Sequence, residues 1–162
     1  MTIRPVEPRD REALHDVVRH AGNFSDEEVA TAMELIDDSL ASHNRGEYST
    51  YVIEDDGTVR GYICLGPTAL TVGTFDLYWI AVDHKTRGKR FGQQLLLFAE
   101  EEVQRRGGRL LLIETSSLPE YESSRRFYRR AGYPEAARIR NFYKPGDDKV
   151  IYAKELALKS GD

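Results

Sequence analysis

The sequence predicts a mixed α/β fold in which helices pack on a central sheet, and two observations lead to this prediction. The hydrophobic period alternates between the repeat of an amphipathic helix and the every-second-residue repeat of a strand. The segments follow in the order strand, helix, helix, three strands, helix, strand, helix and two strands. Because no repeat, linker or low-complexity segment interrupts this order, residues 1–162 are expected to form one domain.

Each element is predicted from its own pattern. Pro5 places the first strand near an edge or end of the sheet, and Ser25 with Glu28 forms a capping box at the start of the second helix. Asp56-Gly57 indicates a hairpin between two strands. In chain order we expect a strand at 2–6, helices at 8–21 and from 25 to 43–46, a hairpin at 49–66, a strand at 74–82, a helix at 91–106, a strand at 109–115, a helix from 117–120 to 132, and strands at 136–143 and 149–158.

Two further signals concern the second half of the chain. Residues 74–82 are apolar enough, above all from Leu77, to lie centrally in the sheet. Ser117 and Glu120 offer another capping box with Pro119 inside its first turn, so the last helix is expected to begin there.

Composition limits the class of protein. Apolar residues make up 40% and charged residues 31% of the chain, no apolar run approaches the roughly 20 residues of a membrane span, and the start is too polar for a signal peptide. The single cysteine, Cys64, has apolar neighbours and is expected in the core. The four histidines show no metal-ligand spacing. We therefore expect a cytoplasmic protein that has no metal and does not bind a membrane.

The charge is divided unevenly along the chain. The net charge is −4, yet residues 1–83 hold 6 basic and 16 acidic side chains, whereas residues 84–144 hold 14 basic and 7 acidic ones. Such asymmetry suggests two faces that meet ligands of opposite charge, although solvated helix faces are the alternative for most of these charges.

The most informative feature is the connection between the strand at 74–82 and the helix after it. Gly88 and Gly92 allow a ligand to approach the backbone closely, and Arg87, Lys89 and Arg90 add positive charge. A helix start also leaves backbone N–H groups unpaired and favours negative charge. The connection therefore predicts a phosphate or pyrophosphate site, although it matches neither a Walker loop nor GxGxxG.

Three features together resemble the GNAT superfamily of N-acetyltransferases. The loop Arg87-Gly88-Lys89-Arg90-Phe91-Gly92 is similar to the superfamily's acyl-CoA loop, (Gln/Arg)-x-x-Gly-x-(Gly/Ala). The strand ending Ile80-Ala81-Val82-Asp83 lies upstream, and RRFYRRAGY, residues 125–133, lies downstream and is similar to the recurring FYxxxGF. The resemblance covers nearly the whole chain and implies the GNAT fold, a central mixed, mostly antiparallel sheet of about six to seven strands flanked by about four helices.

The resemblance also implies acetyl-CoA as cosubstrate, with its pyrophosphate at the loop and its pantetheine arm along the strand end. The implied residues are Ile80, Ala81, Val82, Arg87, Gly88, Lys89, Arg90, Phe91, Gly92 and Gln93. Two positions depart from the family pattern, because Arg90 replaces the middle glycine and Tyr121 replaces an asparagine that would contact pantetheine. We expect Arg90 to adopt ordinary helical dihedrals, which would leave the backbone N–H groups in place.

Acetyl transfer to an amine requires a base or a water path for the amine proton, and an acid for the leaving thiolate. The resemblance places the general acid at Tyr128, which could otherwise be a core residue of its helix. Glu114, at the end of a strand, is the implied base. Asp76 and a bare water relay are the alternatives, and either carboxylate could instead be a solvated edge residue.

The acceptor is expected to bind between the first two helices and the hairpin at 136–150. The acidic N-terminal region suits a cationic amine. The candidate contacts are Asn23, Phe24, Glu27, Asp76 and Tyr143. A hydrophobic staple would explain Phe24 equally well, and Tyr143 is suggested by a resemblance to the hairpin of protein N-terminal acetyltransferases.

The sequence therefore predicts an acetyl-CoA-dependent N-acetyltransferase, an acyltransferase acting on a primary amine of a small molecule or a peptide. The alternative is a non-catalytic acyl-CoA-binding sensor or regulatory module. A nucleic-acid binder that uses the arginines of residues 125–130 is disfavoured by the acidic total and the absence of a reading motif. Analogy with the superfamily suggests a homodimer.

Overall fold

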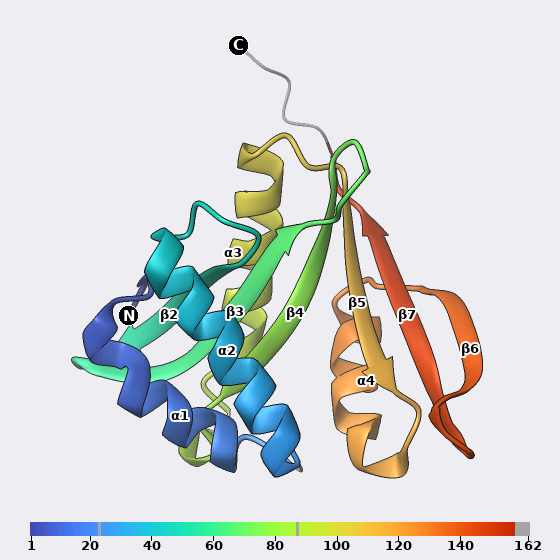
Figure 1. The fold of residues 1–162 in the computed structure, drawn as a ribbon, viewed down its shortest axis with the longest axis horizontal. Helices are drawn as coiled ribbons and strands as arrows, with labels where there is room; N and C mark the ends of the chain where they lie inside the picture. Colours follow the sequence, from blue (N-terminus) through green and yellow to red (C-terminus); the bar gives the residue numbers. More distant parts are fainter. Residues whose placement is uncertain (23, 87, 158–162) are drawn as a thin grey trace.

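The computed structural model describes residues 1–22, 24–86 and 88–157, and its elements follow the predicted order (Figure 1). The strands are β1 (Thr2–Pro5), β2 (Ser49–Asp55), β3 (Thr58–Pro67), β4 (Thr74–Val82), β5 (Leu110–Ser116), β6 (Glu135–Lys144) and β7 (Asp147–Glu155). The α-helices are α1 (Arg11–His20), α2 (Asp26–Ser42), α3 (Phe91–Arg105) and α4 (Glu122–Arg130). Short 3-10 helices are η1 (Pro8–Asp10), η2 (His84–Thr86) and η3 (Pro119–Tyr121).

The strands form one 7-stranded sheet in the order β1-β2-β3-β4-β5-β7-β6. Neighbouring strands are antiparallel except β4 and β5, which are parallel. The edge strands are β1 and β6, so Pro5 lies at an edge, and β4 is central, as predicted. The predicted fold class, a mixed and mostly antiparallel sheet flanked by helices, is confirmed for the described part of the chain.

Different helices cover the two faces of the sheet (Figure 1). On one face, α1 and α2 pack in a core that includes Leu14, Ile36 and Cys64. On the other, α3 and α4 pack in a larger core that includes Leu95 and Tyr128. Cys64 is fully buried, as predicted from its apolar neighbours.

Glu102 of α3 is buried and lies at the centre of a hydrogen-bond network that includes Tyr51 of this larger core. Arg105, Arg106 and the Tyr51 hydroxyl donate hydrogen bonds to its carboxylate over 2.6 to 2.9 Å. Burial opposes ionisation of Glu102, but these donors outweigh it and lower its pKa to about 2. Because Tyr51 belongs to β2, the ionised carboxylate connects α3 to the sheet.

The separation of β4 from β5 positions the candidate site. The two strands pair only from Thr74 with Leu110 to Leu77 with Ile113. Beyond Leu77, β4 continues beside β3, and β5 continues beside β7. A β-bulge occurs at the same point, because Tyr78 is the extra residue in the pairing of β4 with β3. Figure 1 shows the strands side by side at one end and apart at the other.

Two helix starts differ from the prediction. The segment 8–21 divides into η1 and α1, the first with its own capping box. The predicted capping box of Ser117 and Glu120 was wrong, since α4 begins at Glu122 without a side-chain cap. The Ser117 hydroxyl instead accepts a hydrogen bond from the Asp148 amide at 2.7 Å, so tertiary contact with β7 determines its role.

No helix within the three described stretches is long and apolar enough to cross a membrane. The same stretches contain no group of His, Cys, Asp and Glu side chains that could hold a metal ion.

Candidate active site

A cavity of about 930 Å³ opens where β4 and β5 separate. Its walls come from the start of α2, the middle of β4, the end of β5, η3 with α4, and the turn between β6 and β7. The fold brings together the described residues predicted for catalysis and acceptor binding, which all line this cavity: Tyr128, Glu114, Phe24, Glu27, Asp76 and Tyr143.

Tyr128 lies on α4 at the cavity wall. Its side chain packs against the rings of Phe127 and Tyr152, with centroids 5.5 and 6.0 Å away. Burial, followed by the neighbouring Tyr152, raises the pKa of the Tyr128 hydroxyl above its ordinary value. Tyr128 is therefore a buried and protonated phenol at neutral pH, which can donate a hydrogen bond but does not act as a base.

Glu114 and Asp76, the two candidate bases, line the cavity from neighbouring strands. Lys149 Nζ lies 2.9 Å from Glu114 Oε2, and the Glu114 side chain is 43% exposed. Asp76 accepts a hydrogen bond from Thr68 Oγ1 at 2.7 Å. Both carboxylates are held by a partner and accessible from the cavity, so the geometry leaves both as candidates.

The end of β4 offers an open backbone edge beside the cavity. Ile80, Ala81 and Val82 pair with β3 on one side only, because the pairing with β5 stops at Leu77. An extended ligand can therefore add to this edge as a strand would, through backbone N–H and C=O groups. This arrangement fits the pantetheine arm that the sequence predicted here.

The start of α3 offers unpaired backbone donors a few residues further along. The first bond to the cap residue runs from the Gln94 amide to the Arg90 carbonyl at 3.1 Å. The amides of Phe91, Gly92 and Gln93 precede it and have no partner within the helix, and no side chain of the described residues caps them. A β-carbon on Gly92 would meet only ordinary contacts, so this glycine is not required by close packing. The helix start thus fits an anion such as a pyrophosphate.

Arg90 adopts a left-handed conformation, with φ 58° and ψ 25°. The expectation of ordinary helical dihedrals was therefore wrong. The turn ahead of α3 requires positive φ at both Gly88, with φ 92°, and Arg90, and a glycine at the latter position would adopt it without a steric cost. The neighbouring Lys89 reaches toward Asp55 of β2, 3.5 Å away.

The remaining acceptor contacts are placed as follows. Phe24 packs edge-on against Trp79, with ring centroids 5.2 Å apart, so its ring forms part of the cavity wall. Tyr143 projects from β6, and burial, followed by Glu114 and Asp147, raises its pKa. The predicted contacts Asn23 and Arg87 lie outside the described residues.

Sequence reasoning missed two pairs that line the cavity. The Tyr121 hydroxyl donates to Glu28 Oε2 at 3.3 Å and so connects η3 with α2. The Ser116 hydroxyl donates to Asp147 Oδ1, which connects β5 with β7. Only the departure of Tyr121 from the family pattern pointed to either pair, because each forms between segments distant in the sequence.

The four arginines that were considered as a basic helix face differ in their contacts. Arg125 is buried and donates to the carbonyls of Ser116 and Leu118 at 2.6 and 2.9 Å. Arg129 pairs with Glu122 at 2.9 Å. Arg126 and Arg130 are exposed. Half of the proposed face therefore serves contacts within the protein.

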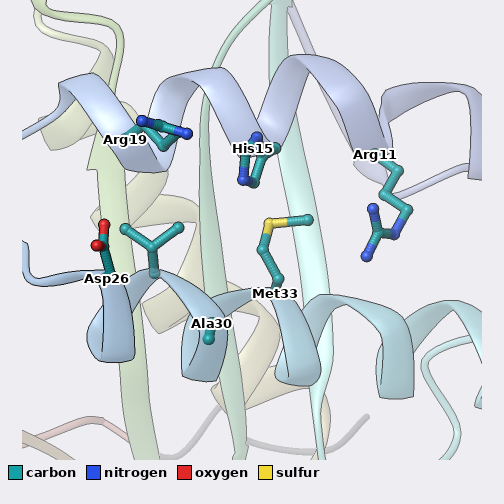
Figure 2. Close-up of a pocket in the computed structure, with 7 residues that line it drawn as sticks. Arg11, His15, Arg19, Asp26, Ala30 and Met33 are labelled. Atoms are coloured by element: carbon teal, nitrogen blue, oxygen red, sulfur yellow. The ribbon is translucent and has the colours of Figure 1, made fainter.

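A second, smaller hollow of about 330 Å³ lies between α1 and α2. Figure 2 shows Arg11, His15 and Arg19 along α1, with Asp26, Ala30 and Met33 facing them from α2. Arg11 is already paired with Asp37 at 2.7 Å. None of the described residues predicted for the active site lines this hollow.

Comparison with protein families identifies the class of protein that this fold and site define. A family model described as an acetyltransferase (GNAT) domain matches residues 46–135, from just before β2 to the first residue of β6. The chain belongs to the GNAT family of acetyltransferases. A search among curated proteins gave no match.

Solved structures agree with this assignment. A protein from Desulfovibrio desulfuricans assigned to the GNAT acetyltransferases is 41% identical, with a TM-score of 0.92 over 96% of this chain and 99% of that one. An aminoglycoside 6'-N-acetyltransferase complexed with coenzyme A is 18% identical, with a TM-score of 0.80 over 99% and 100%. A ribosomal-protein-alanine N-acetyltransferase from Brucella melitensis is 21% identical, with a TM-score of 0.74 over 96% and 100%. At such identities the last two show a shared fold alone.

Proposed function

We propose that this protein is an acetyl-CoA-dependent N-acetyltransferase that acts on a primary amine of a small molecule or peptide. The observation that carries this proposal is the combination of three features along β4 beyond its separation from β5 and directly after its end. These are the open edge of β4, the uncapped start of α3, and a cavity that contains a buried tyrosine and several carboxylates. The GNAT family assignment and the coenzyme A bound to a structural relative support it.

When bound, acetyl-CoA supplies the activated acetyl group as a thioester. The backbone of residues 80–82 would hold its arm, and the amides at 91–93 would hold its pyrophosphate. Lys89 and Arg90 add positive charge beside those amides. With the pyrophosphate at the start of α3, the arm would run back along the open edge of β4, and its reacting end would lie toward Tyr78 and the cavity.

Tyr128 is proposed as the general acid. A phenol has a pKa of about 10 and a thiol of about 8.5, and burial raises that of Tyr128 further. Complete proton transfer to the thiolate is therefore uphill, and the hydrogen bond to the developing negative charge is the larger part of the contribution. Glu114, Asp76 or a water would accept the proton of the attacking amine.

The matched variants Tyr128→Phe and Tyr62→Phe test the assignment of Tyr128. Both remove one buried tyrosine hydroxyl, but Tyr62 lies in the core under α1 and α2, and its hydroxyl has no hydrogen-bond partner among the described residues. We expect Tyr128→Phe to lower kcat by about 100-fold, the scale of one acid–base group, with little change in acetyl-CoA affinity. Tyr62→Phe should leave kcat unchanged. Equal turnover by the two variants would remove Tyr128 from the chemistry.

The non-catalytic alternative, an acyl-CoA sensor, makes a different prediction. A sensor would bind acetyl-CoA with the same open edge and helix start, but no amine would be acetylated. Titration calorimetry with acetyl-CoA and an assay for released thiol separate these two functions on one protein sample.

A further inference from the structure

The carboxylate of Asp147 is buried without a cationic partner. Asp147 begins β7, is 5% exposed and lines the candidate active-site cavity. Its Oδ1 atom accepts a hydrogen bond from the Ser116 hydroxyl. Among the ion pairs of the described residues, none includes Asp147. A buried carboxylate that is hydrogen-bonded only to neutral groups is costly unless a cation reaches it.

The other buried carboxylates in the described chain are treated differently. Asp10 is paired with Arg4 at 2.8 Å, and Glu102 is paired with Arg105 and Arg106 at 2.6 and 2.8 Å. Asp147 is the exception, and it is also the one of the three that lines the cavity. The missing cation is therefore expected to come from a ligand in the cavity.

Other carboxylates that line the same cavity add to the negative charge of Asp147. Four more lining carboxylates, Glu27, Glu28, Asp76 and Glu120, form no ion pair in the described structure, and Glu114 alone is paired, with Lys149. Lys144 is the one basic residue of the described chain that lines the cavity, and it is exposed at the turn. One of these carboxylates affects a tyrosine of the cavity wall: burial and then Glu28 raise the pKa of Tyr121 to about 12.

We propose that the acceptor carries at least two ammonium groups, and that Asp147 binds one that is not acetylated. The acceptor class is a small di- or polyamine. A monoamine would bring at most one ammonium group, which must lose its proton to react, and would leave Asp147 uncompensated. The aromatic rings of Phe24, Trp79 and Tyr143 would cover the methylene groups between the two ammonium groups. This inference builds on the proposed N-acetyltransferase function.

The experiment compares linear α,ω-diamines of increasing length with n-alkyl monoamines of the same length, and measures kcat/KM from thiol release. We expect the best diamine to exceed its matched monoamine by about 10- to 100-fold, which is the scale for a buried charge pair. Equal use of the two series, a preference for neutral amines, or acetylation of single-amine peptides alone would overturn the proposal.

Asp147→Asn removes the charge and keeps an oxygen for the Ser116 hydroxyl. It should remove most of the preference for diamines while kcat/KM for monoamines changes little. Glu34→Gln is the matched control, because Glu34 is exposed on α2 and does not line the cavity. If Asp147→Asn does not fold, the wild-type comparison of each diamine with its matched monoamine still decides, and equal kcat/KM for the two series would overturn the proposal.

Diamine binding measured by calorimetry separates the two levels of inference. If no amine is acetylated but the diamine still binds and Asp147→Asn abolishes this binding, the proposed reaction is wrong and the ammonium site is supported. If amines are acetylated without any diamine preference, the reaction is supported and the ammonium site is wrong. If the protein neither acetylates nor binds diamines, both are wrong.

Discussion

Arg90 provides a test in which backbone strain and ligand binding can be separated. The residue caps α3 with a left-handed backbone, φ 58°, which costs a residue with a β-carbon about 1–2 kcal/mol. Its side chain is exposed and forms no hydrogen bond or ion pair in the described structure. Two variants remove the same charge, Arg90→Gly and Arg90→Ala, but only the glycine also removes the steric cost.

The magnitudes follow from these two effects. Glycine gains the 1–2 kcal/mol of relieved strain and loses about 0.5–1 kcal/mol through greater freedom of the unfolded chain. Arg90→Gly should therefore be more stable than Arg90→Ala by about 1 kcal/mol, or about 2–4 °C in Tm for a chain of this size. Alanine should match the wild type in stability, because the exposed arginine side chain forms no hydrogen bond or ion pair with the described residues.

Acetyl-CoA affinity, unlike stability, should change by the same amount in the two variants. Both variants lose one exposed cation near the start of α3, which is worth up to about 1 kcal/mol, so Kd should rise by up to about 5-fold in each, and kcat should stay the same. Thermal melts without ligand measure the stability of the variants, and calorimetry with acetyl-CoA measures their affinity. Equal stability of the glycine and alanine variants would show that residue 90 is not left-handed in solution, and unchanged affinity would show that its side chain does not contribute to binding acetyl-CoA.

Two further predictions concern carboxylates. The pKa of Glu102 is lowered to about 2, because its three hydrogen-bond donors outweigh its burial. In the unfolded chain the pKa is about 4.3. Ionised Glu102 therefore stabilises the folded protein fully above about pH 4.3, and this stabilisation is lost as the pH falls toward 2. Denaturant titrations should show this loss, on the order of 3 kcal/mol, and Glu102→Gln should remove the pH dependence in that window; an unchanged slope would contradict the network. The acidic limb of the pH–rate profile should disappear in either Glu114→Gln or Asp76→Asn, whichever removes the base, and its persistence in both would favour a water relay.

Much of the fold could be predicted from local pattern. The hairpin at Asp56-Gly57, the capping box at Ser25 and the central strand at 74–82 all formed as expected, because each depends on neighbouring residues and on one buried face. Ser117 shows where such reasoning ends. Its sequence suits a helix cap, but a backbone amide from β7 competes for the hydroxyl, and that partner is distant in the sequence.

The candidate site was predicted in part for the same reason. The loop at 87–92 and Tyr128 belong to continuous motifs that resemblance can detect. The dihedral angles of Arg90 could not be predicted, because they depend on the backbone conformation of the connection between η2 and α3. Asp147 was missed because a carboxylate in a turn is ordinary in sequence, and only the fold buries it beside Ser116.

The point at which β4 separates from β5 could not be predicted from local pattern. Two neighbouring apolar strands are normally paired along their length, and the sequence of neither strand indicates that the pairing ends at Leu77. The bulge at Tyr78 coincides with the end of this pairing, and the candidate active-site cavity opens there. That space is where the proposed reaction takes place.

The most direct test of the proposed function is a mass balance on the wild-type protein with acetyl-CoA and a panel of amines. The panel extends from amino acids through di- and polyamines to short peptides, with released thiol and acetylated amine measured in the same sample. The proposed function predicts equal amounts of thiol and N-acetylated product for at least one amine. Tight binding of acetyl-CoA without acetylated product from any member of the panel would contradict it.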